Sequence, residues 1–83
     1  MTVKLLMNTV SLLNKLKWDS RYDFSKVRVW YVSRGEPDDM AFVDGDDIHV
    51  IGRAFLETAR GYVPHHRIVK IEYEGQEIFR LSS

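Results

Sequence analysis

The sequence predicts a small α+β fold in a single domain, with one N-terminal helix and a mainly antiparallel sheet of five to six short strands. Three observations lead to this prediction. The 83 residues leave room for one domain only. Apolar residues recur at helical spacing near the N-terminus, and the later ones form short β-branched and aromatic runs between turn residues. We expect residues 1–9 to be an N-terminal extension and residues 10–83 to be the domain.

The helix is expected over residues 9–17, where Asn8 or Thr9 can cap the first turn. Its apolar positions follow the helical period and are Val10, Leu12, Leu13 and Leu16. The expected strands are residues 27–33, 40–43, 54–58, 62–63, 69–73 and 78–81. Residues 48–51 fit either a strand or a helical turn.

The last two strands form a hairpin around Gly75. A three-residue loop with Gly75 in the left-handed conformation is the expected connection. A two-residue loop would instead place Glu72 opposite Glu77, where like charges repel each other.

Composition excludes several classes of protein. The chain has no cysteine, which rules out disulfides, thiolate zinc sites and thiol nucleophiles and fits a cytoplasmic protein. Its apolar runs are far shorter than a membrane helix needs, so we expect no membrane partner. The three histidines lack metal-ligand spacing, and no glycine-rich phosphate loop is present, so we expect neither a metal nor a cofactor.

The charge is balanced in number but not in position. Twelve Lys and Arg residues face twelve Asp and Glu residues, which argues against a nucleic-acid coat over the whole surface. Residues 36–47 hold six of the acids and no Lys or Arg. The segment is either a solvated polar loop or one side of a charge separation that leaves a basic face able to take a phosphate.

The densest candidate site is the segment 63–68, Val-Pro-His-His-Arg-Ile. Arg67 offers a planar fork of donors that matches two phosphate oxygens, and His66 can donate to a third. Adjacent residues of an extended chain point to opposite faces, so His66 and Arg67 act together only if the chain turns after Pro64. The structural alternative is a histidine that binds a backbone carbonyl and an arginine that pairs with an acid.

A second candidate lies at the end of the first expected strand. Arg34 precedes Gly35 at a sheet rim, where backbone N–H groups can approach an anion. The aromatic side chains of Trp30 and Tyr62 can stack on bases. The structural alternatives are an ion pair between Arg34 and the acidic segment, and a core position for the aromatic rings.

Four segments in order resemble the small archaeal family known as the RNA cyclic group end recognition domain. They are Leu13–Asp19, Val29–Tyr31 with Arg34-Gly35, Ile51–Arg53 before Phe55, and Val63–Ile68. The resemblance covers residues 12–80, and His65 stands where the family often has an aromatic or aliphatic residue. It implies recognition of RNA ends that bear a cyclic phosphate or a similar group, with Arg53 among the site residues. It also implies RNA as the partner, together with RNA-processing enzymes.

The leading interpretation is therefore a non-enzymatic module that binds RNA ends in RNA processing or repair. Its site residues are Arg34, Arg53, His66, Arg67, Tyr62 and Trp30. One alternative is a small RNA phosphoesterase in which His66 acts as general acid or base with help from His49 or His65. Another is a protein-interaction module that adds an edge strand to a partner's sheet.

Overall fold

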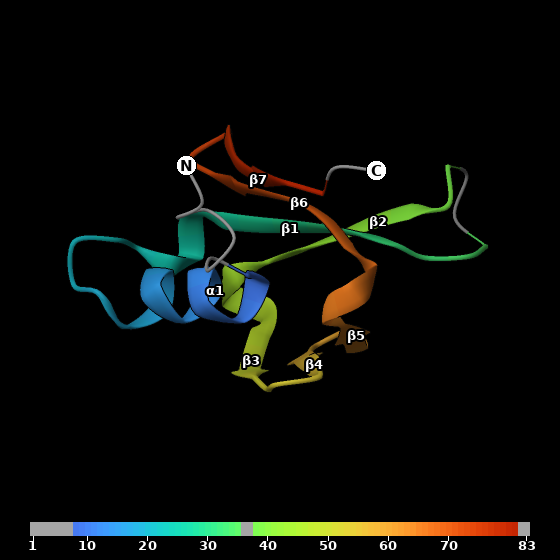
Figure 1. Ribbon diagram of the computed structural model, residues 1–83, viewed down its shortest axis with the longest axis horizontal. Helices are drawn as coiled ribbons and strands as arrows, with labels where there is room; N and C mark the ends of the chain where they lie inside the picture. Colours follow the sequence, from blue (N-terminus) through green and yellow to red (C-terminus); the bar gives the residue numbers. More distant parts are fainter. Residues whose placement is uncertain (1–7, 36–37, 82–83) are drawn as a thin grey trace.

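The computed structural model describes residues 8–35 and 38–81. These residues form one α-helix and seven strands, and the strands make two antiparallel sheets (Figure 1). The predicted α+β class is confirmed, and the strand count exceeds the expected five to six. The additional strand is Ile48–Ile51, the segment whose sequence fits either a strand or a turn. Residues 1–7 of the expected N-terminal extension and residues 36–37 of the acidic segment lie outside the described residues.

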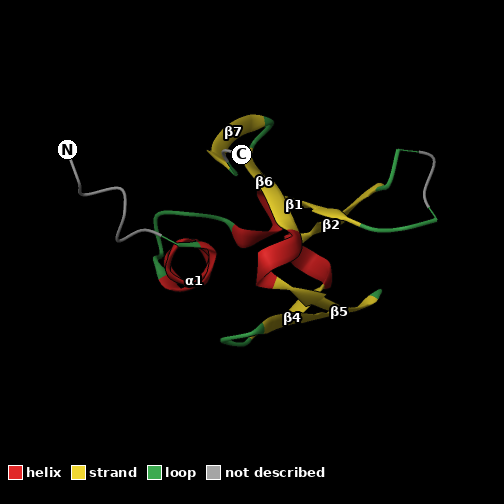
Figure 2. Ribbon diagram, turned by 45° about the vertical axis from the view of Figure 1, so that its right-hand side comes forward, coloured by secondary structure: helices red, strands yellow, loops and turns green. Residues whose placement is uncertain are grey.

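Helix α1 spans Thr9–Trp18, in agreement with the predicted range. The Asn8 side chain caps it by accepting a hydrogen bond of 2.9 Å from the Ser11 amide. Leu13 and Leu16 on this helix are buried in the core. Figure 2 views α1 almost end-on, beside the strands. No helix within residues 8–35 and 38–81 is long and apolar enough to cross a membrane.

The larger sheet has the strand order β2-β1-β6-β7. Its strands are β1 (Val27–Val32), β2 (Met40–Asp44), β6 (Ile68–Tyr73) and β7 (Gln76–Arg80). In β1 the buried and less buried residues alternate, so one face of the sheet packs into the core and the other faces outward.

The smaller sheet has the strand order β3-β4-β5 and lies below the larger one in Figure 1. Its strands are β3 (Ile48–Ile51), β4 (Phe55–Thr58) and β5 (Gly61–Pro64). Alternation again separates two faces, since Leu56 is fully buried and its neighbour Phe55 is exposed. The residues that the sheets and the helix bury together are Leu13, Leu16, Val27, Val29, Tyr31, Ala41, Val43, Ile48, Leu56, Val63, Ile68 and Ile71.

Two short 3₁₀ turns carry the chain between the sheets. The turn η3 (Gly45–Asp47) leads from β2 into β3, and η4 (His65–Arg67) leads from β5 into β6. The chain therefore does turn after Pro64, as cooperation between His66 and Arg67 requires. The two crossings differ in charge, because η3 carries two aspartates and η4 carries two histidines and an arginine.

The β6–β7 hairpin differs from the expected three-residue loop. Its turn consists of Glu74 and Gly75 alone, with φ values of 52° and 82°. Two consecutive residues with positive φ are typical of the tight turns that match the twist of antiparallel strands. Glu72 consequently does lie opposite Glu77. The repulsion between them is offset because Lys70 lies 3.6 Å from Glu72 and Arg80 lies 2.6 Å from Glu77.

Gly45, at the start of η3, is buried against the backbone of the short turn η2 (Phe24–Lys26), which precedes β1. A Cβ atom at residue 45 would lie 1.8 Å from the Phe24 carbonyl oxygen. This contact cannot be relieved by rotating a side chain, because the obstructing atom belongs to the backbone. The glycine therefore allows η2 and η3 to pack together.

We expect Gly45→Ala to lower the free energy of unfolding by about 3 kcal/mol, the upper end of the usual cost of overpacking. Gly75→Ala is the matched control, since its Cβ would meet nothing within 4 Å and only the positive φ opposes it. The control should cost about 1 kcal/mol. Denaturant titration followed by tryptophan fluorescence measures both values. Equal losses would contradict the steric explanation.

Candidate functional site

The His65 side chain joins three segments of the chain. Its Nε2 atom lies 2.8 Å from the Gly52 carbonyl oxygen in the β3–β4 turn, and its Nδ1 atom lies 2.7 Å from the Thr9 hydroxyl in α1. A carbonyl oxygen can only accept, so Nε2–H is the donor, and in the neutral ring Nδ1 accepts from Thr9. The His65 amide also donates to the Ala54 carbonyl, at 2.9 Å. His65 therefore holds η4 against the helix and the β3–β4 turn.

This junction brings three of the predicted site residues into adjoining segments. Arg53 lies between Gly52 and Ala54, the two residues whose carbonyls accept hydrogen bonds from His65. His66 and Arg67 follow His65 directly in η4. We call Arg53, His66 and Arg67 the basic cluster.

All three members of the basic cluster are exposed. Within residues 8–35 and 38–81, none of their side chains takes part in an ion pair or a hydrogen bond. Of the structural alternative, one part is found, since His65 binds the Gly52 carbonyl. The other part, an ion pair between Arg67 and an acid, is not found in the described part of the chain. The cluster offers two guanidinium groups and an imidazole to solvent.

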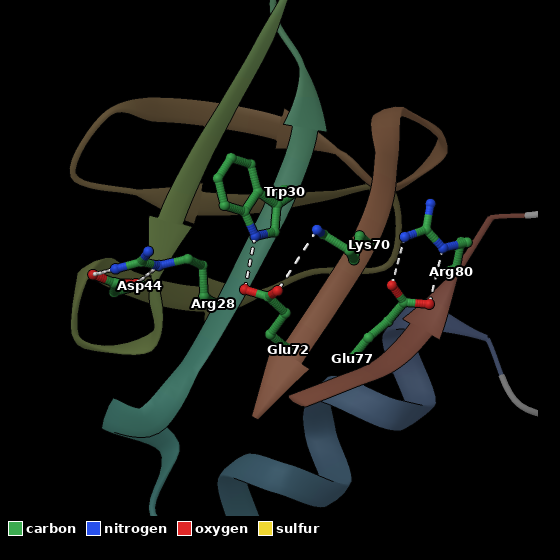
Figure 3. Close-up of polar contacts among 7 residues, drawn as sticks. All are labelled: Arg28, Trp30, Asp44, Lys70, Glu72, Glu77 and Arg80. Atoms are coloured by element: carbon green, nitrogen blue, oxygen red, sulfur yellow. Dashed lines mark hydrogen bonds and ion pairs between the residues drawn. The ribbon is translucent and has the colours of Figure 1, made fainter. Parts of the chain in front are cut away.

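The outer face of the larger sheet is different, because its cations already have partners (Figure 3). Arg28 contacts Asp44 at 2.8 Å, and Arg80 contacts Glu77 at 2.6 Å. The hydrogen bond that Arg28 donates to the Asp44 carboxylate raises the pKa of Arg28. The hydrogen bond from Arg80 lowers the pKa of Glu77. These two arginines already donate to a carboxylate, whereas the side chains of the basic cluster have no such partner in the described part of the chain.

Trp30 lies on this same outer face, away from the smaller sheet. Its Nε1–H donates to Glu72 Oε1 at 3.0 Å (Figure 3). The indole ring packs against Phe42, with the ring centroids 5.0 Å apart, and Lys70 Nζ lies 5.0 Å from the centroid of the indole. Trp30 is half-buried, which leaves part of its indole ring accessible. Its contact with a base stays a prediction. Its surroundings differ from those of Tyr62.

Tyr62 lies on the outer face of the smaller sheet, where 68% of its surface is exposed. Its neighbour there is Phe55, at a distance of 5.7 Å between ring centroids. Tyr62 is thus outside the core, and the core alternative does not hold for it. The sequence interpretation did not include Phe55 among the site residues. The signal for Phe55 was its alternation with Leu56, which predicts opposite faces but does not show which face is buried.

The pairing of β1 with β6 shows where Arg34 lies relative to Arg67. Tyr31 in β1 pairs with Ile68, the first residue of β6. Arg67 immediately precedes Ile68, and Arg34 follows Tyr31 by three residues, so both arginines lie at the same end of the strand pair. Arg34 is exposed in the β1–β2 connection. Its role stays a prediction.

The remaining histidine, His49, is far from the basic cluster. It lies near the start of β3, where Ile48 pairs with Thr58 at the end of β4, next to the β4–β5 turn. The cluster lies at the other end of this sheet, where Phe55 pairs with Pro64. His49 is thus separated from His66 along the sheet, and both ring nitrogens of His65 already have partners. The role of His66 as a general acid or base stays a prediction.

An apolar pocket of about 200 Å³ lies elsewhere, between α1 and the β6–β7 hairpin. Its lining residues are Leu12, Lys15, Leu16, Tyr22, Tyr73 and Ile78. None of the predicted site residues contributes to it. The members of the basic cluster lie instead on the exposed surface around η4.

Comparison with known proteins identifies the family. The model of the MJ1316 RNA cyclic group end recognition domain matches residues 6–80. A UPF0248 protein of Archaeoglobus fulgidus is 42% identical over 69 residues, which cover 82% of this chain and 97% of that protein. A UPF0248 protein of Pyrobaculum aerophilum is 37% identical over 71 residues, which cover 81% of this chain and 88% of that protein. No solved structure matches. The resemblance in the four sequence segments is confirmed, and the chain belongs to the MJ1316 RNA cyclic group end recognition domain family.

Proposed function

We propose that this protein is a binding module for RNA termini that carry a cyclic phosphate or a similar end group, and that it serves RNA processing or repair. The observation that carries the proposal is the basic cluster itself. Arg53, His66 and Arg67 come from two segments that His65 holds together, and all three are exposed. The name of the matching family supports the same ligand class.

The chemistry of the cluster suits a terminal phosphate. The Arg67 guanidinium can donate two parallel hydrogen bonds to the two non-bridging oxygens of a cyclic phosphate. His66 can donate one more from its ring, and Arg53 adds a second positive charge from the neighbouring turn. The site needs no metal to neutralise the single charge of a cyclic phosphate.

The overall charge favours recognition of an end over coverage of a strand. The formal net charge is zero, so the molecule has little general attraction for the RNA backbone. A site with a few phosphate contacts releases few counterions, which gives a shallow dependence of affinity on salt. The cluster can therefore discriminate one end group without binding RNA indiscriminately.

Arg67→Ala should weaken binding of an RNA with a 2′,3′-cyclic phosphate by roughly 1.5–3 kcal/mol, the usual value of a hydrogen bond to a charged group. Fluorescence anisotropy with labelled RNA measures this change. Arg80→Ala is the matched control, because Arg80 is also exposed but is bound to Glu77 at 2.6 Å. The control should leave the affinity unchanged.

The same RNA with a 3′-hydroxyl end tests the proposed ligand directly. Wild-type protein should prefer the cyclic phosphate, and Arg67→Ala should reduce that preference. Equal affinity of the wild type for both ends would show that the end group is not recognised. Release of an opened phosphate during the incubation would instead indicate a phosphoesterase.

His65→Leu should lower the free energy of unfolding by roughly 2–3 kcal/mol, because it removes two hydrogen bonds and leaves the Gly52 carbonyl unpaired. If His65 also positions the basic cluster, the preference for the cyclic phosphate should fall in the folded variant. Thr9→Val removes only the bond to Nδ1 and should cost about 1 kcal/mol. Calorimetry and anisotropy report the two effects separately. An unchanged end preference in folded His65→Leu would limit His65 to a structural role.

A further inference from the structure

The outer face of the β3–β4–β5 sheet carries two neighbouring aromatic rings, which we call the aromatic platform (Phe55 and Tyr62). Phe55 is 48% exposed and Tyr62 is 68% exposed. They occupy adjacent strands on a diagonal, since Phe55 pairs with Pro64 and Tyr62 pairs with Glu57. Their ring planes are inclined by 47°, so the rings do not stack flat on each other.

The alternation of the strands fixes this arrangement. Leu56 and Val63 point into the core with 0% and 2% exposure, which forces Phe55 and Tyr62 to the opposite face. Val50 of β3, which pairs with Glu57, adds a further exposed apolar side chain at 45%. About half of Phe55 and two thirds of Tyr62 are therefore open to solvent. Exposed aromatic surface gathered in this way is typical of a binding site.

The platform continues into the basic cluster. Arg53 precedes Phe55 by two residues, and Pro64, the partner of Phe55, immediately precedes η4. A ligand that lies on the rings therefore meets positive charge at this end. Glu57 lies opposite Tyr62, nearer the other end, and its carboxylate repels phosphates there. The cation at that end, Arg60, donates to the Phe42 carbonyl of the larger sheet at 3.5 Å. The charges thus favour a ligand whose phosphate lies at the η4 end and whose apolar part lies over the rings.

We propose that the aromatic platform binds unpaired bases, so that the ligand of this protein is a single-stranded RNA end with at least two unpaired nucleotides. This inference rests on the proposed function, because it uses the basic cluster as the position of the terminal phosphate. Each ring offers one face to one base, as aromatic residues on exposed sheets do in other RNA-binding folds. A blunt duplex end leaves only the outer face of its terminal base pair free, because all other base faces are covered by their neighbours. Such an end can therefore stack on one of the two rings but not on both.

A protein partner or a second copy of the chain is the competing occupant of this face. The cations beside the platform complement a phosphate better than an apolar partner, which is why we assign the face to RNA. The test therefore includes a measurement that would detect a second copy of the chain on this face.

Three labelled RNAs of one sequence test the proposal, each with a 2′,3′-cyclic phosphate. The first is single-stranded, the second is a blunt duplex, and the third is a duplex with a two-nucleotide 3′ overhang. We expect the single strand and the overhang to bind alike in anisotropy measurements and the blunt duplex to bind at least about tenfold more weakly. Equal binding of all three RNAs overturns the proposal.

Two variants address the rings themselves. Phe55→Leu and Tyr62→Leu should each weaken binding of the single strand by about tenfold, within the range for stacking of one base on one aromatic ring. Trp18→Leu is the matched control, because Trp18 is 73% exposed at the far end of α1, away from His65. Its binding should equal that of the wild type. Unchanged binding by both platform variants overturns the proposal.

The outcomes separate this inference from the proposed function. If the cyclic phosphate is preferred over a 3′-hydroxyl but strandedness and the rings have no effect, the platform assignment fails and end recognition stands. If strandedness and the rings matter but the end group does not, end recognition fails and the platform stands. Sedimentation equilibrium completes the test, since a wild-type dimer that Tyr62→Leu dissociates, without any effect on RNA binding, assigns the face to a second copy.

Discussion

The hydrogen bonds of the His65 ring are the contact on which the rest of this structure depends. They satisfy a backbone carbonyl in the β3–β4 turn and a hydroxyl in α1, at the place where the chain leaves one sheet for the other. A partly buried carbonyl without a donor would destabilise that crossing. Because the ring is engaged at both nitrogens, the crossing has one geometry, and His66 and Arg67 are presented to solvent from a fixed base.

A net charge of zero is compatible with a local anion site, because the acidic turn η3 and the basic turn η4 lie beside different parts of strand β1. Arg28, near the start of β1, pairs with Asp44, which directly precedes η3, whereas Tyr31, near its end, pairs with Ile68, which directly follows η4. Three residues of a strand correspond to about 10 Å, roughly one Debye length at 0.1 M salt. The aspartates of η3 therefore reduce the positive potential at the basic cluster only slightly. The net charge of zero for the whole chain does not reveal that the end of the molecule around η4 is positively charged.

The two sheets expose faces of different chemistry. On the larger sheet, charged side chains pair with one another and with Trp30, so that surface is internally satisfied (Figure 3). On the smaller sheet, the exposed Phe55 and Tyr62 lie side by side, with their ring centroids 5.7 Å apart. The first arrangement suits a solvated surface, whereas the second leaves apolar area that a ligand can cover. The adjoining basic cluster makes an RNA end the ligand that fits both features.

Local signals in the sequence were sufficient for the helix, for most of the strands and for the family. The period of the apolar residues and the Asn8 cap determine α1, because both act within one helical turn. The β6–β7 hairpin was predicted wrongly, since the repulsion between Glu72 and Glu77 is offset by cations whose positions depend on pairing between strands. The bonds of His65 to residues 9 and 52, and the exposure of Phe55, likewise could not be derived from neighbouring residues. Sequence alone determined which residue types are present and which local elements they form, and the tertiary structure decided which of them meet, because those contacts join segments that are distant in the chain.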